Sequence, residues 1–280
     1  MVDQPAKPLN KIDRYAVVGN PISHSKSPQI HAAFAKQTGQ PISYESVLAP
    51  LDGFEATIRD LIKQGFNGAN VTVPFKLAAF TLCDNLSARA YAAGAVNMLT
   101  FANGKISGDN TDGAGLINDI TQNLGVALDS AQILLLGAGG AAQGVLLPLL
   151  NAQPASITIA NRSLEKAHFM VQKIATDHAV CNITISHYAH LHSEFDVIIN
   201  ATSTGLSDSA LPIPDVIFAK NCLAYDMMYG VETAFMAQAR ANGEQVADGL
   251  GMLVEQAAEA FYLWRFVRPD TMPVIKMMRS

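Results

Sequence analysis

Short apolar runs separated by turn residues recur through the second half of the chain. The residues Ile133–Leu136 are apolar without interruption, which is typical of a strand buried on both faces of a parallel sheet. Comparable runs predict strands at 132–136, 156–160, 183–186, 197–200, 222–226 and 245–247, with helices between them. This alternation from Gln132 to Ala247 is the pattern that a doubly wound parallel sheet requires.

The first half of the chain also alternates between strand and helix patterns. Strands are predicted at 15–18, 43–47 and 68–73, and helices at 28–38, 54–64, 76–81, 87–93 and 115–123. Pro28 suits the first position of its helix, with Ser27 as the expected N-cap. A hairpin is expected to turn at Asn103-Gly104, and a long final helix is expected over 251–266.

A glycine-rich turn follows the strand at 132–136 directly. The residues Gly137-Ala138-Gly139-Gly140-Ala141-Ala142 match the pattern G-x-G-x-x-G/A, with a helix predicted from Ala141 to Leu150. Such a turn lets backbone N–H groups and a helix N-terminus approach a pyrophosphate closely. Glycine turns also serve as plain connections, so the turn alone leaves both interpretations open.

The end of the next strand separates the possible dinucleotides. An acidic residue about 20 positions beyond the glycine turn would accept a hydrogen bond from a ribose 2′-hydroxyl. Here Asn161-Arg162-Ser163 stands at that place, and no carboxylate occurs before Glu165. Arg162 offers a planar fork that matches a phosphate, and Lys166 adds a second cation. Alternatively, Ser163 is only the N-cap of the next helix, and Arg162 and Lys166 are solvated surface cations. We predict that the two cations bind a phosphate and that the cofactor is NADP(H) rather than NAD.

These patterns predict an α/β protein with two α/β domains. We expect a Rossmann-type dinucleotide-binding domain at 114–247, and an N-terminal substrate domain at 1–113 that the C-terminal segment 248–280 completes. A chain of 280 residues is long enough for two domains of ordinary size. The final helix is expected to pack back on the first domain, because it has no other partner.

Composition narrows the functional classes. A net charge of −5 without any Lys/Arg run argues against binding to nucleic acid or to anionic membranes. Three cysteines without metal or redox spacing indicate reduced thiols in a cytoplasmic protein, and the polar N-terminus resembles no signal peptide. The spacing of His187, His190 and His192 lacks neighbouring Cys or carboxylate clusters, so no metal is expected. The expected assembly is a monomer or homodimer.

Polar residues cluster at predicted element ends in the first half. Asn70 and Thr72 are two positions apart on one strand, which Pro74 ends and Lys76 follows. Ser23 and Ser25 share the same spacing after the first strand, and Asn97 and Asp112 lie near later element ends. Because ligands of open α/β sheets bind at strand carboxyl ends, this set suits a small polyol that carries a carboxylate. Each residue alone is also an ordinary turn or capping residue.

Several motifs in order along the chain resemble shikimate dehydrogenases. They are Gly19-Asn20-Pro21-Ile22-Ser23-His24-Ser25-Lys26-Ser27-Pro28, Gly68-Ala69-Asn70-Val71-Thr72-Val73-Pro74-Phe75-Lys76, Gly94-Ala95-Val96-Asn97, Gly108-Asp109-Asn110-Thr111-Asp112-Gly113, the glycine turn, Asn200-Ala201-Thr202-Ser203, Tyr225-Asp226-Met227-Met228-Tyr229 and Asp248-Gly249-Leu250-Gly251-Met252. The resemblance implies NADPH-dependent reduction of 3-dehydroshikimate to shikimate in aromatic amino-acid biosynthesis.

The resemblance also implies roles for individual side chains. The substrate carboxylate would be held by Ser23, Ser25 and Tyr229, and the ring hydroxyls by Asn70, Thr72, Lys76, Asn97, Asp112 and Gln256. Gln256 fits this independently, because it interrupts an otherwise apolar face of the last helix and needs a partner. His24, between the two serines, is expected to point away from them by alternation.

The resemblance likewise implies a set of cofactor contacts. These are Gly137, Ala138, Gly139, Gly140, Ala141, Asn161, Arg162, Ser163, Lys166, and, near the nicotinamide, Thr202, Ser203, Met227 and Gly249. Family members commonly carry Asn-Arg-Thr and a second Arg where this chain has Ser163 and Lys166. The 2′-phosphate would therefore be bound by the planar guanidinium of Arg162 and the single ammonium of Lys166. This substitution leaves the strength of the preference for NADP over NAD open.

Reduction of a ketone by a nicotinamide requires a proton donor for the developing alkoxide. Lys76 and Asp112 can both serve, and the hypothesis is that Lys76 transfers the proton while Asp112 orients it. One alternative function is a quinate/shikimate dehydrogenase that accepts NAD as well. Another, of a different class, is a non-catalytic sensor of NADPH, which would not need this acid/base pair.

Overall fold

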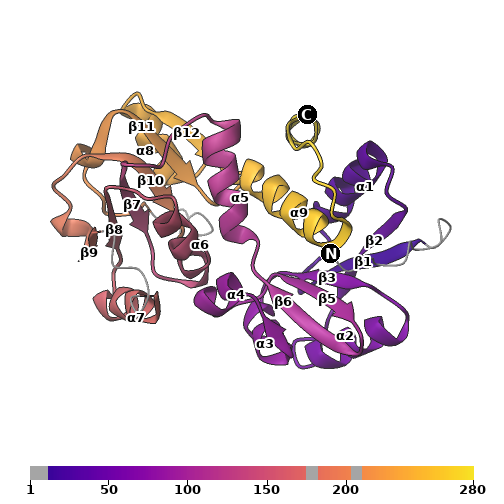
Figure 1. Ribbon diagram of the computed structural model, residues 1–280. Coiled ribbons are helices and arrows are strands. Elements are labelled where there is room, and N and C mark those ends of the chain that lie inside the picture. Colours follow the sequence, from indigo (N-terminus) through magenta and orange to yellow (C-terminus); the bar gives the residue numbers. More distant parts are fainter. Residues whose placement is uncertain (1–11, 175–181, 203–209) are drawn as a thin grey trace.

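The computed structural model describes residues 12–174, 182–202 and 210–280. In these residues the chain forms two six-stranded sheets, one in each lobe of the molecule (Figure 1). The predicted α/β class with two α/β units is confirmed. None of the helices in the described ranges has the length and apolar character needed to cross a membrane.

The N-terminal sheet is mixed and has the strand order β2-β1-β3-β5-β6-β4. β1 pairs in parallel with β2 and β3, whereas β5 runs antiparallel to both β3 and β6. The predicted hairpin is confirmed, because Asn103 and Gly104 both have positive φ at its turn. The strands are β1 Asp13–Gly19, β2 Ile42–Leu48, β3 Gly68–Val71, β4 Asn85–Leu86, β5 Met98–Ala102 and β6 Lys105–Asp109. The helices of this lobe are α1 Ser27–Thr38, α2 Phe54–Lys63, α3 Lys76–Leu82 and α4 Ala88–Ala93.

The second sheet is parallel throughout and has the order β12-β11-β10-β7-β8-β9. The chain leaves β7 toward β8 and β9, then returns to the other side of β7 as β10, so the topological switch point lies between β7 and β10. The strands are β7 Gln132–Leu136, β8 Ser156–Ala160, β9 Asn182–Ser186, β10 Phe195–Asn200, β11 Phe218–Asp226 and β12 Gln245–Asp248, and the helices are α6 Gly140–Asn151, α7 Leu164–Ile174 and α8 Ala234–Ala241.

The apolar run of β7 is explained by helices on both faces of this sheet. Ile133 and Leu135 pack in the cluster that contains Val145 and Leu149 of α6. Leu134 and Leu136 pack on the opposite face, in the cluster that contains Phe235 of α8 and its neighbours. Since alternate side chains of a strand face opposite sides of the sheet, all four had to be apolar.

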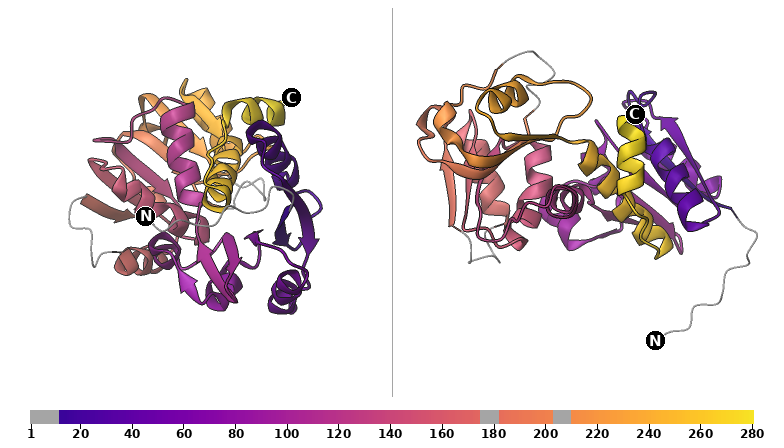
Figure 2. Two further views of the ribbon diagram at one scale, coloured as in Figure 1. Left: turned by 45° about the vertical axis from the view of Figure 1, so that its right-hand side comes forward. Right: turned by 90° about the horizontal axis from the view of Figure 1, so that it is seen from above.

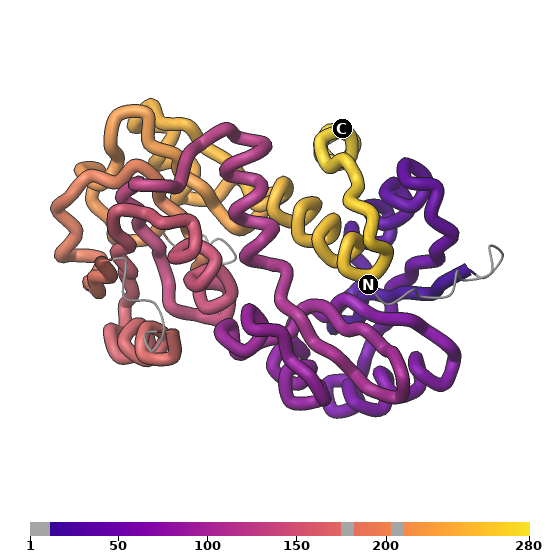
Figure 3. The backbone as a smooth tube through the Cα atoms, in the orientation of Figure 1, coloured from indigo at the N-terminus to yellow at the C-terminus, as the bar shows by residue number. Residues whose placement is uncertain are grey.

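Two helices connect the lobes. α5, Asp112–Asn118, continues into a π-helical turn at Asp119–Asn123, and it packs against α9, Leu250–Arg265. In Figure 3, α9 runs from the second sheet toward α1, and α10, Met272–Arg279, follows it. Phe261 of α9 contacts Phe34 of α1, so α9, the helix expected at 251–266, packs on the N-terminal lobe as the sequence predicts. Figure 2 shows the same arrangement from two further sides.

Some element ends differ from the sequence predictions. α1 begins at Ser27 itself, with Lys26 at the N-cap position and no side-chain cap, so the prediction of Ser27 as N-cap is wrong. β3 ends at Val71 rather than Val73, because Pro74 cannot donate to a ladder and the chain turns from Thr72 to Phe75. The short strand β4 and the helix α10 follow no pattern that the sequence interpretation used.

Glycines allow α5 and α9 to approach closely. A Cβ at Gly251 would lie 2.0 Å from Asp119 Oδ1. We expect Gly251→Ala to lower the free energy of unfolding by about 1–3 kcal/mol, because the added methyl group must displace the buried Asp119 carboxylate, which accepts from the Tyr225 hydroxyl. Gly144→Ala in α6 is the control, since its nearest Cβ contact is 3.8 Å and alanine favours helix. The midpoints of urea unfolding measure the stability of both variants. Equal midpoints for Gly251→Ala and Gly144→Ala would contradict the close packing at Gly251.

Candidate active site

A cavity lies where the carboxyl ends of β1 and β3 face α9 and the segment that follows β11. Its wall includes residues of all these elements, together with the loop after β1 and the start of α5. Most of the predicted substrate-binding residues line it: Ser25, Asn70, Thr72, Lys76, Asn97, Asp112, Tyr229 and Gln256. The structure therefore brings together side chains that are far apart along the sequence, from Ser25 to Gln256.

The loop after β1 departs from the prediction. Ser23 is exposed and does not line the cavity, whereas His24 and Ser27 do. The reason is a turn closed by a hydrogen bond from the Ser25 N–H to the Ile22 carbonyl, at 3.0 Å. Strand-like alternation does not hold in a turn, so the spacing argument for where His24 points does not apply here. Ser27 is buried in the first turn of α1, a position that a spacing argument from Ser25 could have reached.

Lys76 and Asp112 form an ion pair at the cavity wall. Lys76 Nζ lies 2.6 Å from Asp112 Oδ2, and the two side chains are 32% and 19% exposed. Asn97 Nδ2 donates to the other oxygen, Asp112 Oδ1, at 2.8 Å. Both carboxylate oxygens of Asp112 are thus engaged, while the Lys76 ammonium makes one hydrogen bond within the described residues and retains further N–H donors.

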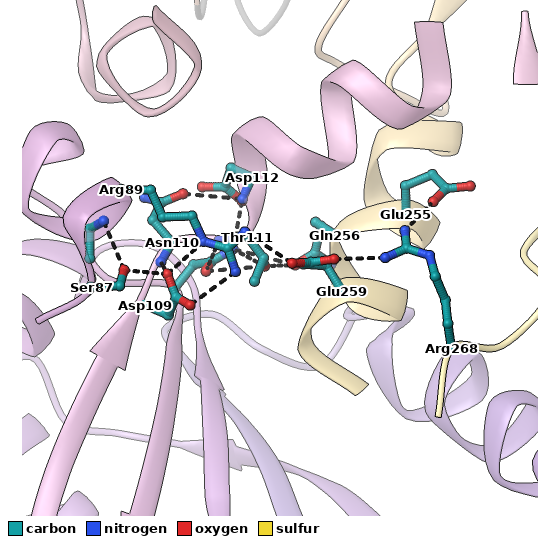
Figure 4. Close-up of polar contacts among 12 residues, drawn as sticks. Ser87, Arg89, Asp109, Asn110, Thr111, Asp112, Glu255, Gln256, Glu259 and Arg268 are labelled. Carbon is teal, nitrogen blue, oxygen red and sulfur yellow. Dashed lines mark hydrogen bonds and ion pairs between the residues drawn. The ribbon is translucent and has the colours of Figure 1, made fainter. Parts of the chain in front are cut away.

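Asn97 connects the carboxylate to the bend that precedes α5. Its Oδ1 accepts from the Thr111 N–H at 2.8 Å, and Gln256 Oε1 of α9 lies 3.4 Å from Asn97 Nδ2. Figure 4 shows Thr111, Asp112 and Gln256 in this arrangement. Because Asn97 is only 3% exposed, its hydrogen bonds define its orientation and, through it, the position of the Asp112 carboxylate.

A cluster of charges supports the same bend from outside the cavity. Arg89 of α4 pairs with Asp109 at the end of β6 and with Glu259 of α9, at 2.7 and 3.0 Å (Figure 4). Burial acts to raise the pKa of Asp109, but hydrogen bonds from Arg89 and Ser87 outweigh it and hold that pKa below its usual 3.8. Asp109 is therefore ionised at neutral pH, and its pair with Arg89 fixes the bend that carries Asp112.

A second cavity lies at the carboxyl ends of β7, β8 and β9. It is lined by these predicted cofactor residues: Gly137, Ala138, Gly139, Gly140, Ala141, Asn161, Arg162, Ser163, Lys166 and Thr202. Further lining residues that the sequence interpretation missed are His187, Tyr188, Ala210, Leu211 and Pro212. Their position after β9 and β10 is the signal that could have found them. Ser203 lies outside the described residues.

The glycine turn provides space for an anion. A Cβ at Gly139 or Gly140 would meet no atom within 4 Å, so the space above these residues is open for a pyrophosphate. Gly137 has a φ of 108°, which favours glycine. α6 begins at Gly140 without a side-chain cap, so its first N–H groups can donate to a bound anion. These residues fit a dinucleotide.

The ends of β10 and β11 link the two cavities. Asn200 Oδ1 accepts from Thr202 Oγ1 at 2.7 Å, and Asn200 Nδ2 donates to the buried Asp226 carboxylate at 3.0 Å. Asp226 Oδ1 in turn accepts from the Met228 N–H at 2.9 Å. Thr202 lines the second cavity, whereas Met227 and Gly249, predicted near the nicotinamide, line the first. The hydrogen-bonded ends of β10 and β11 therefore connect the wall of the second cavity to the wall that holds the Lys76–Asp112 pair.

Comparison with known proteins agrees with this geometry. Family models match residues 17–99 (shikimate dehydrogenase substrate binding domain), 119–207 (shikimate / quinate 5-dehydrogenase) and 249–275 (shikimate 5′-dehydrogenase C-terminal domain). The shikimate dehydrogenase (NADP(+)) of Methylobacillus flagellatus is 57% identical over 270 residues, covering 96% of this chain and 100% of its own. The chain belongs to the shikimate dehydrogenase family. The resemblance seen in the sequence is confirmed.

Solved structures of similar proteins show the same fold. A shikimate dehydrogenase of Thermus thermophilus in complex with NADP(H) and shikimate has a TM-score of 0.84 and 32% identity, covering 96% of this chain and 99% of its own. The Ael1 enzyme from Pseudomonas putida has a TM-score of 0.90 and 46% identity, covering 95% and 97%. The fold of this chain is therefore shared with both of these proteins.

Proposed function

We propose that this protein catalyses the reversible, NADPH-dependent reduction of 3-dehydroshikimate to shikimate, a step of aromatic amino-acid biosynthesis. The observation that carries the proposal is the Lys76–Asp112 ion pair, which lies in a cavity rich in amide and hydroxyl groups. Relatives at 57% identity are named as NADP-dependent shikimate dehydrogenases, and a solved relative holds both NADP(H) and shikimate.

The substrate contacts follow from the lining of the first cavity. Ser25, Ser27 and Tyr229 would hold the carboxylate, with Ser27 in place of the expected Ser23 because Ser27 lines the cavity. Burial raises the pKa of Tyr229, so its hydroxyl keeps its proton and can donate to a carboxylate. The ring hydroxyls would be bound by Asn70, Thr72, Lys76, Asn97, Asp112 and Gln256.

Lys76 is the proposed proton donor. Bound NADPH would supply the hydride to the ketone carbon, which leaves negative charge on the carbonyl oxygen. The Lys76 ammonium has N–H donors beyond the one that contacts Asp112, and one of them can protonate that oxygen. Asp112, with both oxygens engaged, orients the ammonium. In the reverse direction neutral Lys76 accepts the hydroxyl proton.

The second cavity would bind the cofactor phosphates. Gly137–Ala141 and the start of α6 would hold the pyrophosphate, and the exposed Arg162 and Lys166 would hold the 2′-phosphate. Asn161 Nδ2 donates to the Ser163 carbonyl at 2.8 Å, which orders the loop that carries Arg162. Thr202, Ser203, Met227 and Gly249 would surround the nicotinamide.

The proposed domain division keeps the boundaries expected from the sequence. Residues 1–113 with 248–280 would form the substrate domain, and 114–247 the cofactor domain. The packing of α9 on α1 supports this division, because it attaches the C-terminal segment to the N-terminal lobe. We also propose a cytoplasmic location and a monomeric or homodimeric state. The free thiols of Cys83 and Cys222 support the cytoplasmic location, because a reducing compartment keeps thiols reduced.

Steady-state rates with two substrates and two nucleotides test the function. We expect shikimate with NADP to give the highest kcat/KM, and quinate or NAD to give much lower values. Comparable rates with quinate and NAD would favour the quinate/shikimate alternative. Intact nucleotide binding without any shikimate-dependent formation of NADPH would favour a non-catalytic sensor.

A further inference from the structure

Tyr44 lies behind the substrate cavity, on a strand that does not line it. In the register of the sheet, Tyr44 of β2 is opposite Tyr15 of β1, and Val17 of β1 is opposite Asn70 of β3. The Tyr44 hydroxyl donates a hydrogen bond to Asn70 Oδ1 at 2.7 Å, and Ser27 hydrogen-bonds to the same hydroxyl. Asn70 and Ser27 line the cavity, so Tyr44 contacts the site through these residues.

The ring of Tyr44 is held in place by aromatic packing. His31 of α1 stacks on it, with ring centroids 4.0 Å apart and an angle of 7° between the planes. His31 is fully buried, and its ring also lies near that of Trp264, with the two ring centroids 5.7 Å apart. Burial lowers the pKa of His31 to about 3 and raises that of Tyr44 well above 10.0, so both rings are neutral at physiological pH.

The hydrogen bonds of Asn70 have one consistent assignment. Its Nδ2 donates to the Asn97 main-chain carbonyl at 3.2 Å, and a carbonyl can only accept. Oδ1 therefore faces Tyr44, whose hydroxyl must donate to it. Without that donor, the 3.2 Å hydrogen bond from Nδ2 would hold the Asn70 amide less firmly, because the terminal torsion of amide side chains is broad.

We propose that Tyr44 is a positioning residue for the substrate: its hydroxyl fixes the Asn70 amide in the orientation that recognises a ring hydroxyl. This role rests on the proposed function of the cavity, and Tyr44 itself does not touch the substrate. Because Asn70 has no part in proton transfer, loss of the Tyr44 hydroxyl weakens substrate binding and leaves the chemical step intact.

The test compares Tyr44→Phe with Tyr15→Phe. Tyr15 is its neighbour on the next strand, but the Tyr15 hydroxyl bonds to Arg265 and Tyr15 does not line the cavity. We expect Tyr44→Phe to raise the KM for shikimate about three- to tenfold, with kcat and the KM for NADP nearly unchanged. Tyr15→Phe should change none of these constants. Urea midpoints of both variants show whether each is folded.

A double-mutant cycle distinguishes a specific effect on Asn70 from a general loss of stability, because only the specific effect depends on Asn70 being present. In the Asn70→Ala background, Tyr44→Phe should raise the KM for shikimate no further, because the group that it orients is gone. An unchanged KM in Tyr44→Phe, an equal rise in Tyr15→Phe, or additive effects in the cycle would each overturn the proposal. Failure of the proposed function would give a different result from failure of the Tyr44 proposal, because the unaltered protein would then not oxidise shikimate at all.

Discussion

Lys76→Ala is expected to lower kcat for shikimate oxidation by about 10²- to 10⁴-fold, the usual contribution of a positioned acid or base. The KM for shikimate should change only modestly, because the hydrogen bonds that we propose from Asn70, Asn97 and Gln256 to the ring hydroxyls would be kept. Steady-state kinetics with saturating NADP measure both constants.

Lys63→Ala is the matched control for this substitution. Lys63 pairs with Asp60 at 3.0 Å on the surface of α2, and its side chain is 76% exposed. Losing a lysine–carboxylate pair there should leave kcat unchanged. If Lys76→Ala raised KM while kcat stayed at the wild-type value, Lys76 would be a binding residue and the proton-transfer role would pass to Asp112.

Arg162→Ala is expected to raise the KM for NADPH by about 10- to 100-fold, the usual range for hydrogen bonds between charged groups. The KM for NADH should be nearly unchanged, because NADH lacks the 2′-phosphate. Lys166→Ala should have a smaller effect in the same direction, since an ammonium is a point charge without the planar fork. Kinetics with each nucleotide separate these effects.

Arg59→Ala serves as the control for charge alone. Arg59 pairs with Glu55 at 2.6 Å on the surface of α2, and its side chain is 58% exposed. Arg59→Ala changes the net charge by the same amount as Arg162→Ala, but it should leave the KM for NADPH and the KM for NADH at the wild-type values. Equal losses for NADPH and NADH in Arg162→Ala would contradict the phosphate assignment, because Arg162 would then contact a part common to both nucleotides.

The sequence was sufficient for the second sheet because physical constraints there are local. The residues Ile133–Leu136 are apolar since both faces of β7 are buried, and Gly137 follows because the chain must turn with positive φ. A glycine turn, an Arg after the next strand and a buried strand together predict the dinucleotide cavity. No long-range contact had to be known.

The substrate cavity depends on contacts that no local pattern contains. Ser27 lines it and Ser23 does not, because a hydrogen-bonded turn at 22–25 breaks the alternation that the spacing argument assumed. Tyr44 reaches Asn70 across β1, which depends on the register of three strands. The π-helical turn after α5 is similar: buried Asp119 there accepts from the Tyr225 hydroxyl, more than a hundred positions away.

The central claim is that hydride passes directly between the substrate carbon and the nicotinamide of a bound NADP(H). Shikimate that carries deuterium on the carbon whose hydroxyl becomes the ketone tests this claim most directly. Incubation with NADP and the enzyme, followed by mass spectrometry of the nucleotide, should show deuterium transferred into NADPH. Formation of NADPH without the label, or no reduced nucleotide at all, would contradict the account.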